Sequence, residues 1–408
     1  MSYNNIIKYL FNLKGSEEKG TGYNLDIQNI RTLLDKIGNP EKYISAIHVA
    51  GTNGKGGVCA MLSSILKEAG YKVGMYTSPH LVDFKERFQI NGKKISKKEF
   101  IHYFNKVKKY VTNQTFFEVI TALAFFYYKE KNVDYLVLET GLGGRLDATN
   151  VVNPLLSVIT NINLEHTQLL GKNINKIAFE KAGIIKNNKP VVTGASGSAL
   201  SVIKKIAKKC NSQLYSVKKY KKINDKFIFN NYNFKLKLQG DYQIENAALA
   251  VTAIDVLNEH YNLKIDRYKI KNGLLKTKWP GRFEFIGKRL LVDCAHNPSA
   301  ALALKNNILK ARYKNIILII GVLKDKDYKK ILAILTPLAY KVILTKPSIL
   351  RAREPEELAE YMETFNKKYE IIKNVRKAIK HAEVISNKDD IILITGSIYV
   401  VGEAMTSK

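Results

Sequence analysis

Short runs of apolar residues, rich in Val, Ile and Leu, alternate along the chain with longer stretches of helical periodicity. The short runs are typical of buried β-strands and the longer stretches of amphipathic helices. Repeated alternation of the two predicts an α/β protein with mainly parallel sheets. In the first half of the chain we expect strands at residues 45–50, 72–76, 134–139, 155–160 and 190–192, and helices at 55–69, 116–129 and 174–184.

The pattern changes after residue 225. Residues 226–238 alternate apolar and polar positions around Asn230 and Asn231, which predicts a β-hairpin. We expect this hairpin to pack on an edge of the first domain. An alanine-rich helix is expected at 241–257.

The pattern breaks at Trp279, Pro280 and Gly281, and a second alternating series follows. Its strands are expected at 290–293, 316–321, 341–345, 369–372 and 391–395. We therefore predict a larger α/β domain over residues 1–281 and a smaller, Rossmann-like α/β domain over residues 282–408. A chain of 408 residues with 46% hydrophobic content is long enough for two such cores.

Composition narrows the class of partner. The formal net charge is +30, but the lysines are spread along the chain in short clusters and no nucleic-acid recognition motif accompanies them. We therefore expect no nucleic-acid partner. The longest apolar run, residues 119–128, is about half of what a membrane span needs, so we expect no membrane partner.

The N-terminal residues and the cysteines bear on the location and redox state of the protein. The first residues lack a basic segment followed by an apolar stretch, so we expect a cytoplasmic protein. We also expect a monomer. Cys59, Cys210 and Cys294 are far apart and show no paired spacing, which favours reduced, structural cysteines over a metal or redox centre.

A glycine-dense turn joins the expected strand at 45–50 to the expected helix at 55–69. Such a turn brings backbone N–H groups and a helix N-terminus to a phosphate, with a lysine reaching the outer oxygens. The general P-loop pattern is not matched, because Val49 stands at the first glycine position and Gly56 follows Lys55. So many glycines would be costly in a turn that binds nothing, so we expect phosphate binding by Gly51, Thr52, Asn53, Gly54, Lys55, Gly56 and Gly57.

The segment from Gly51 to Gly56 resembles the loop of the Mur-type amide ligases, in particular the folylpolyglutamate and dihydrofolate synthase branch. Further matches follow in the family's order and cover essentially the whole chain. They are 76–81 with Glu86 and Arg87, Phe117 and Glu118, 139–150, 160–162 with His166 and Thr167, 180–186, 238–240 with Gln243, 245–247, 280–282, Asp293, 295–298, and 395–397 with Tyr399.

Three positions depart from the family pattern. Gly57 stands where a Ser is usual, Tyr242 where a His commonly precedes the Gln, and Cys294 where a Gly is usual. The first departure removes a hydroxyl near the phosphates. The other two bear on nucleotide affinity or on the fit between the domains.

The resemblance implies an ATP-dependent ligase that joins glutamate to dihydropteroate, to the γ-carboxylate of folates, or to both, through an acyl phosphate. Our hypothesis is a bifunctional enzyme. Phosphoryl transfer to a carboxylate depends on positioning and on charge stabilisation by Mg²⁺, Lys and Arg, and Lys55 is the natural partner of the γ-phosphate. Glu139 ends one expected strand and His166 follows another, so both should lie at the ligand edge of the sheet.

The family's metal site implies Mg²⁺ held by Ser78, Glu139 and His166. The lysine that matches Lys181 is carbamylated in the family, and its anion helps hold a second Mg²⁺. A lysine reacts with CO₂ only when it is partly deprotonated, which a buried, electropositive site favours. Taken alone, His166 is more typical of a core or surface histidine and Lys181 of a solvated side chain.

The remaining implied contacts lie at both ends of the substrates. For ATP they are Asn246, Arg282 and Asp293, with the catalytic His296 close by. For the pterin they are Thr115, Phe116, Phe117, Glu118, Leu146, Asp147 and Ala148. Phe116 could equally well be a core residue, and the same alternative is weaker for Phe117.

Two other functions stay open. A Mur ligase of cell-wall synthesis shares the loop and the chemistry but takes a nucleotide-linked muramyl peptide. A basic P-loop protein that binds nucleic acid would instead hydrolyse ATP when nucleic acid is added and ignore pterins. The motifs of the second domain speak against this last reading.

Overall fold

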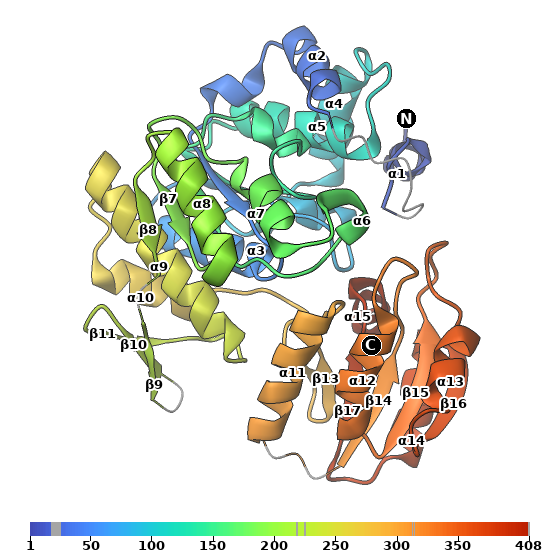
Figure 1. Ribbon diagram of the computed structural model, residues 1–408. Coiled ribbons are helices and arrows are strands. Elements are labelled where there is room, and N and C mark those ends of the chain that lie inside the picture. Colours follow the sequence, from blue (N-terminus) through green and yellow to red (C-terminus); the bar gives the residue numbers. More distant parts are fainter. Residues whose placement is uncertain (18–25, 218, 224–225, 312, 314, 407–408) are drawn as a thin grey trace. The chain divides into compact units, whose positions relative to one another are not determined.

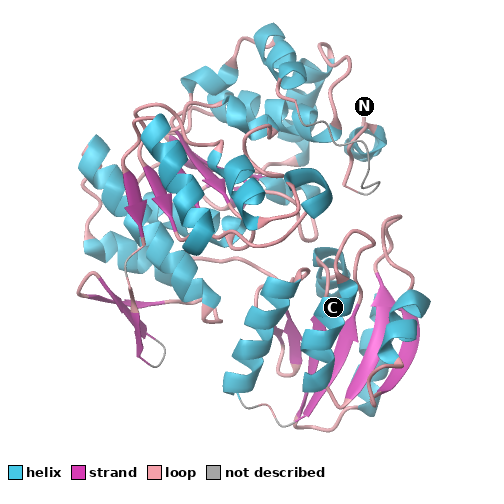
Figure 2. Cartoon of the chain, viewed as in Figure 1, coloured by secondary structure: helices cyan, strands magenta, loops and turns pink. Residues whose placement is uncertain are grey.

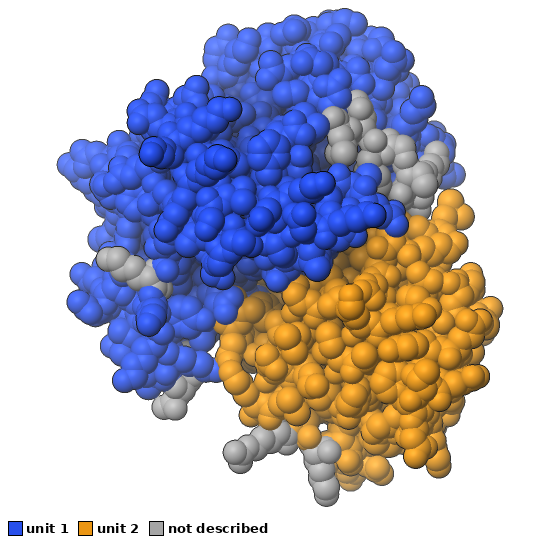
Figure 3. All heavy atoms as spheres, viewed as in Figure 1, with its two compact units in different colours: residues 1–80, 84–237, 243–278 blue, residues 81–83, 238–242, 279–408 orange. Residues whose placement is uncertain are grey.

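The computed structural model describes residues 1–17, 26–217, 219–223, 226–311, 313 and 315–406. The chain forms two compact units, coloured separately in Figure 3. Unit 1 comprises Met1–His80, Phe84–Lys237 and Gln243–Lys278, and unit 2 comprises Leu81–Asp83, Leu238–Tyr242 and Trp279–Lys408. The domain division that we predict at residue 281 stays a prediction, because compactness alone assigns no function to either unit.

The centre of unit 1 is an eight-stranded sheet with the order β4-β3-β2-β5-β1-β6-β7-β8. The strands from β2 to β8 in this order are parallel, and β3 and β4 extend the sheet in antiparallel fashion. Their bounds are β1 Ala46–Ala50, β2 Val73–Tyr76, β3 Phe88–Ile90, β4 Lys93–Lys94, β5 Tyr135–Glu139, β6 Leu156–Ile159, β7 Val191–Thr193 and β8 Leu214–Ser216. The predicted α/β class with mainly parallel sheets is confirmed (Figure 2).

Helices cover the sheet of unit 1 (Figure 1). Their bounds are α1 Tyr3–Asn12, α2 Gln28–Lys36, α3 Lys55–Glu68, α4 Lys97–Lys108, α5 Phe116–Glu130, α6 Thr167–Leu170, α7 Ile174–Ala182, α8 Gly197–Lys209, α9 Tyr242–Tyr261 and α10 Arg267–Lys276. One apolar core joins α1, α2, α4 and α5 to the sheet, and another joins α7 and α8 to the ends of β1 and β6. The sheet is buried between helices, which explains its continuous apolar strands.

The predicted hairpin is confirmed as β10 Lys226–Phe229 and β11 Tyr232–Lys235. The sequence pattern did not indicate a third strand, β9 Lys221–Ile223, which pairs with β10 to make a separate small sheet. Asn230 and Asn231 both have positive φ, as a two-residue hairpin turn requires. The small sheet lies against α10 within unit 1, and Asn230 donates a hydrogen bond to Asp255 of α9.

Unit 2 is built on a six-stranded sheet with the order β12-β13-β17-β14-β15-β16, parallel except for β12. The strands are β12 Glu284–Ile286, β13 Leu290–Val292, β14 Asn315–Ile320, β15 Lys341–Lys346, β16 Lys368–Asn374 and β17 Asp390–Thr395. The helices are α11 Pro298–Ala311, α12 Tyr328–Leu335, α13 Pro355–Met362, α14 Val375–Ile385 and α15 Ile398–Met405. Alternate residues of β14 face two cores, one with α11, α12 and α13 and one with α14 and α15.

Candidate active site

The glycine-dense loop leaves the central strand of unit 1. Strand β1 ends at Ala50, and α3 begins at Lys55. The neighbouring parallel strands β5 and β6 end at Glu139 and Ile159, so the segments that follow all three strands meet at one edge of the sheet. The carboxyl edge of a parallel sheet is where ligands bind in such folds.

The first half of the loop is held by the segment that follows β6. Thr52 N donates to Asn161 O (2.8 Å), Asn53 N donates to Asn161 Oδ1 (3.0 Å), and Thr160 Oγ1 donates to Asn53 O (2.7 Å). A Cβ at Gly51 would lie 1.8 Å from Thr160 Oγ1, so no larger residue fits there. The structure thereby gives Thr160 and Asn161 a role in shaping the loop that the sequence did not reveal.

The second half of the loop lies against α9. Gly54 has a φ of 85°, and a Cβ there would lie 2.3 Å from Asn246 Oδ1. Asn246 also donates a hydrogen bond to Gln243 Oε1 (3.0 Å). Asn246 is thus brought to the loop from nearly two hundred positions further along the chain, where the sequence motif placed an ATP contact.

Two lysine ammonium groups meet at one backbone carbonyl of the loop. Lys55 Nζ donates to Gly51 O (3.2 Å) and Thr52 O (3.3 Å), and Lys181 Nζ donates to Gly51 O (2.7 Å). Lys181 comes from α7 and is buried. Burial, followed by the nearby charge of Lys55, lowers the pKa of Lys181 to about 7, although the carboxylates of Glu165 and Asp147 act in the opposite direction.

The structure brings two of the four predicted metal-site residues into contact. Glu139 is buried at the end of β5, and its Oε2 accepts a hydrogen bond from Ser78 N (3.2 Å), just beyond β2. His166 has a φ of 49°, caps α6, and its Nε2 lies 3.9 Å from Glu165 Oε1. Glu165, whose side chain is only 8% exposed, was not predicted from the sequence.

The donor set fits Mg²⁺. Over the described ranges, no three His, Cys, Asp or Glu side chains gather into a protein-only metal site. Mg²⁺ does not need one, because it usually binds through one or two carboxylates, waters and substrate phosphates. Glu139 beside the phosphate loop supplies such a carboxylate, and carbamylation of Lys181 would add a second anion.

The predicted pterin residues fall into two segments with different packing. Thr115 and Glu118 form a capping box at the start of α5, in which Glu118 Oε2 accepts from Thr115 N (2.7 Å). The Phe116 ring is fully buried and stacks on Phe11 with centroids 5.2 Å apart. The Phe117 ring is half-buried and covers Gly141, where a Cβ would lie 2.5 Å from it.

The second segment is the loop that follows β5. Leu146 is half-buried, and Ala148 is buried. Asp147 is buried and accepts hydrogen bonds from Leu142 N (2.7 Å) and Thr149 N (3.0 Å). Burial raises the pKa of Asp147, against the effect of these hydrogen bonds. The loop contacts α7 beside Lys181, because a Cβ at Gly144 would lie 2.8 Å from Lys181 O.

In unit 2 the predicted residues surround the end of β13. Asp293 is buried and accepts from Phe283 N (2.9 Å), Ala295 N (2.8 Å) and the Tyr242 hydroxyl (2.7 Å). Burial raises its pKa, and the charge of Arg282 acts in the opposite direction. His296 is half-buried, and its Nδ1 lies 2.9 Å from Cys294 O. Arg282, Asp293 and His296 thus lie near the same strand end, and their role as ATP contacts stays a prediction.

Comparison with known proteins identifies the family of the chain. Residues 49–254 match the Mur ligase middle domain, and residues 281–398 match the Mur ligase glutamate ligase domain. The dihydrofolate synthase/folylpolyglutamate synthase of Bacillus subtilis is 36% identical, over 92% of this chain and 93% of the relative. The chain belongs to the dihydrofolate synthase/folylpolyglutamate synthase family.

Solved structures of this family share the whole fold. The E. coli FolC structure in complex with DHPP and ADP is 30% identical, with a TM-score of 0.90 over 100% of this chain and 97% of that one. The Yersinia pestis bifunctional enzyme, solved with AMPPNP and a Mn ion, is 28% identical with a TM-score of 0.89, over 100% of this chain and 98% of that one.

The family also includes longer chains. A probable bifunctional folylpolyglutamate synthase/dihydropteroate synthase of Haloferax volcanii is 34% identical over the whole of this chain, which spans half the length of that relative. Among the described residues, no helix is long and apolar enough to cross a bilayer.

Two departures from the family pattern now have a structural setting. A Cβ at Gly57 would lie 3.2 Å from Asn246 Nδ2, so the usual Ser would require a small shift of Asn246. Tyr242 reaches Asp293 through its hydroxyl, and it therefore adds a hydrogen-bond donor to a carboxylate that already accepts two backbone amides. The roles of these residues in nucleotide binding stay predictions.

A buried ion pair fixes the N-terminal segment of this family member to the segment after β2. Arg87 is fully buried and donates to Glu17 Oε1 (3.0 Å) and to His80 Nδ1 (3.1 Å from Nε). Its guanidinium also lies over the rings of Phe84 and Phe116, 5.2 and 5.6 Å from the centroids. The sequence gives no local signal for a pair whose members are seventy positions apart.

Replacing Glu17 by alanine should lower the free energy of unfolding by about 3 kcal/mol, because the buried Arg87 loses its counter-charge. The control is Glu86→Ala, which removes a partner of the largely exposed Lys94 and should cost less than about 1 kcal/mol. Urea denaturation of both variants measures the difference. Equal losses would show that the Arg87 pair contributes no more than a surface ion pair.

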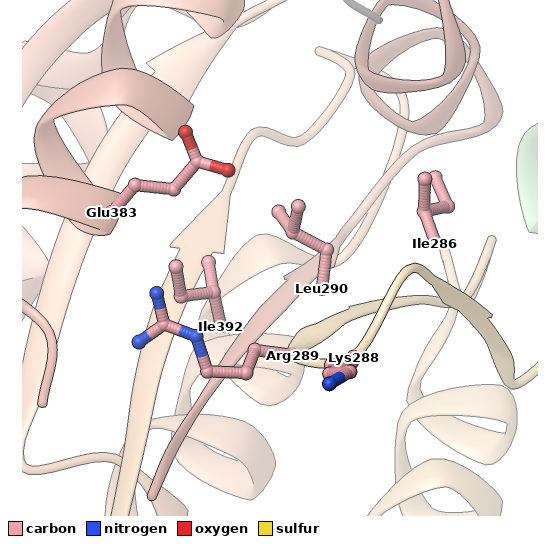
Figure 4. A pocket seen from close by; sticks show the side chains of 6 residues that line it. All are labelled: Ile286, Lys288, Arg289, Leu290, Glu383 and Ile392. Carbon is pink, nitrogen blue, oxygen red and sulfur yellow. The ribbon is translucent and has the colours of Figure 1, made fainter. Parts of the chain in front are cut away.

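Figure 4 shows a pocket within unit 2. It is lined by Ile286, Lys288, Arg289, Leu290, Glu383 and Ile392. The pocket is at the start of β13, whereas Asp293 and His296 follow the end of that strand. Arg289 Nη1 already donates to Ser386 Oγ (3.0 Å) and Asn387 O (2.6 Å), so the pocket is not part of the candidate site.

Proposed function

We propose that the protein is an ATP-dependent ligase that adds L-glutamate to dihydropteroate and to the γ-carboxylate of reduced folates. The observation that carries the proposal is the convergence of Lys55 and Lys181 on the Gly51 carbonyl, in the glycine-dense loop at the carboxyl edge of the sheet where Glu139 also lies. Membership of the dihydrofolate synthase/folylpolyglutamate synthase family supports both acceptors.

The reaction proceeds in two transfers. An oxygen of the acceptor carboxylate attacks the γ-phosphorus of ATP, and the bond to the bridging oxygen breaks, which gives an acyl phosphate and ADP. The amine nitrogen of glutamate then attacks the acyl carbon, phosphate leaves with the bonding electron pair, and the nitrogen loses a proton. Both transfers concentrate negative charge, so the site must supply cations and N–H donors.

The loop and Lys55 bind the phosphates in this proposal. The backbone N–H groups at the start of α3 face the phosphate position, and the helix dipole favours an anion there. Lys55 now donates to carbonyl oxygens of its own loop, which hold its ammonium beside that position. It would exchange these carbonyls for the γ-phosphate oxygens.

Ser78, Glu139, His166 and a carbamylated Lys181 are the proposed holders of Mg²⁺. The ion would neutralise charge on the phosphates during transfer. Lys181 fits carbamylation because a pKa of about 7 leaves much of its amine neutral, and only the neutral amine adds to CO₂. Glu139 fits because its carboxylate is buried beside Ser78.

In this proposal the pterin of the acceptor substrate binds where the start of α5 meets the loop after β5. Phe117 offers a half-exposed ring over Gly141, and Asp147 has acceptor capacity beyond its loop hydrogen bonds. Phe116, Thr115 and Glu118 have packing and capping roles that support this edge. The proposed contacts for the rest of ATP are Asn246, Arg282, Asp293 and His296.

A cytoplasmic location and a monomeric state stay predictions.

The deciding experiment measures incorporation of labelled glutamate by the purified protein with ATP and Mg²⁺. Dihydropteroate and tetrahydrofolate are supplied in separate reactions, and the products are resolved by mass. We expect a mono-glutamylated product from the first and an extended tail from the second. Product from one acceptor alone would remove the bifunctional proposal, and incorporation with neither would overturn the folate proposal.

Two controls test the competing functions in the same assay. A nucleotide-linked muramyl peptide should accept no amino acid, and added nucleic acid should not stimulate ATP hydrolysis. Activity in either control would favour the muramyl ligase or the nucleic-acid-stimulated ATPase.

A further inference from the structure

Three buried polar side chains form a hydrogen-bonded chain between β1 and the loop that follows β5. His48 is on β1 and is fully buried, Thr149 is fully buried, and Asp147 is 5% exposed. His48 Nε2 lies 2.8 Å from Thr149 Oγ1, and Thr149 Oγ1 donates to Asp147 Oδ1 at 2.5 Å. The chain therefore links the strand that carries the phosphate loop to the proposed acceptor loop.

The hydrogen bonds of this chain run in one direction. An ionised Asp147 only accepts, so the Thr149 proton is directed to it and the Thr149 lone pair accepts from His48. Burial and the nearby charge of Lys186 lower the pKa of His48 to about 3, so the ring is neutral. His48 then carries its proton on Nε2, and its Nδ1 is a buried atom without a hydrogen-bond partner in the described protein.

Further hydrogen bonds hold the rest of the loop. Asn150 Nδ2 donates to Arg145 O (2.9 Å) and Gly183 O (3.0 Å), and Lys186 Nζ donates to Asn150 O (2.9 Å). These bonds hold the backbone of the loop after β5 and involve no side-chain atom of His48 or Thr149. A polar histidine in a central strand, with one ring nitrogen unpaired, is costly for a fold that the other bonds already hold.

We propose that His48 and Thr149 are positioning residues for the acceptor substrate. The Thr149 hydroxyl holds Oδ1, and the Leu142 amide holds Oδ2, so the carboxylate plane of Asp147 is fixed. Oδ1 accepts from both Thr149 N and Thr149 Oγ1, so the acceptor site left to a ligand is on Oδ2, and the fixed plane gives it one orientation. The Phe117 ring covers Gly141 at the start of the same loop. The inference rests on the proposed function, in which Asp147 accepts hydrogen bonds from the N–H groups of a pterin.

The test compares Thr149→Val with Thr149→Ser. Valine keeps the shape but removes the hydroxyl, so the KM for dihydropteroate should rise about tenfold, as expected for one good hydrogen bond, while the KM for ATP changes less than about twofold. Serine restores the hydroxyl and should return the acceptor KM to near the wild-type value. In the same way, His48→Gln keeps a donor and should resemble wild type, whereas His48→Leu should resemble Thr149→Val.

Thr193→Val is the matched control for the loss of a buried hydroxyl. Thr193 is fully buried on β7, and its hydroxyl donates to Ile159 O (3.0 Å). This control should lower the Tm as Thr149→Val does but leave both KM values unchanged. If Thr149→Val does not fold, Thr149→Ser and His48→Gln are compared with His48→Leu by equilibrium dialysis of dihydropteroate.

Several outcomes would overturn the proposal. A folded Thr149→Val enzyme with an unchanged acceptor KM would do so, and so would equal increases in both KM values, which indicate a general distortion of the site. A wild-type enzyme that incorporates no glutamate refutes the proposed function instead. Nitrogen NMR of the His48 ring should show a proton on Nε2 alone, and a proton on Nδ1 would contradict the direction of the chain.

Discussion

Lys55→Met should reduce the turnover number for glutamate incorporation by about a thousandfold, which corresponds to about 4 kcal/mol of transition-state stabilisation. Methionine matches the length and apolar stem of lysine but carries no charge. The Lys55 ammonium lies within 3.2–3.3 Å of two carbonyls of the phosphate loop, so the fold holds it beside the expected γ-phosphate. Its loss removes a cation at the point where charge is transferred.

The matched control is Lys67→Met on the same helix. Lys67 is exposed in the last turn of α3, far along the helix from the loop. This variant should keep the turnover number within about twofold, because the effect of a distant, screened surface charge is small. ATP affinity of Lys55→Met, measured by calorimetry, separates weak binding from slow transfer. A turnover number above about a tenth of the wild-type value would contradict the role of Lys55 in transfer.

The strands that hold the site were predictable because they are buried on both faces. Strands β5 and β14 contain continuous apolar runs and β1 is apolar except for His48, and a run of that kind between turn residues indicates a strand in a parallel sheet. Within the part of the chain that the structure describes, the pattern missed the strands β3, β4, β8, β9 and β12. Each has two or three residues, too few to show a period, and most of their side chains are at least partly exposed.

The positions of site residues were predictable only where a strand end determined them. Glu139 closes an apolar run, so its place at the sheet edge followed from the sequence. Thr115 and Glu118 have the spacing of a capping box, a local signal that explains both residues without a ligand. His48 and Thr149, by contrast, meet across 101 positions, and no local pattern marks either of them.

The buried state of Lys181 is the clearest case of information that tertiary packing alone supplies. On α7 a lysine at this position reads as a solvated side chain. In the fold it reaches the Gly51 carbonyl, 130 positions away, and is 3% exposed. The family resemblance suggested an unusual lysine, and the packing supplies the physical reason for its low pKa.

Lys181→Met should abolish glutamate incorporation and at the same time stabilise the metal-free protein at neutral and acidic pH. The unfolded state binds a proton at Lys181 with a pKa of about 10.4, whereas burial lowers the folded-state pKa to about 7. Between these values the unfolded state binds more protons than the folded state. The free energy of unfolding of wild type, relative to Lys181→Met, should therefore rise with pH across this window and stay constant below about pH 7.

The full difference between the two limits is about 5 kcal/mol, set by the gap between the two pKa values. Urea unfolding of both proteins at several pH values between about 6 and 9 should show about 3 kcal/mol of this difference. The buffers contain a chelator and no CO₂, so that neither metal binding nor carbamylation contributes. Lys176→Met, on an exposed face of the same helix, is the control and should show no such pH dependence.

Carbamylation of Lys181 can be tested separately from its pKa. Added bicarbonate should raise the activity of wild type in CO₂-depleted buffer and leave Lys181→Met inactive, and labelled CO₂ should give a carbamate signal only in wild type. If the stability difference between wild type and Lys181→Met does not change with pH, Lys181 keeps its proton in the folded state. A permanently protonated lysine has no lone pair to add to CO₂, so that single result would remove both the low pKa and the proposed carbamate.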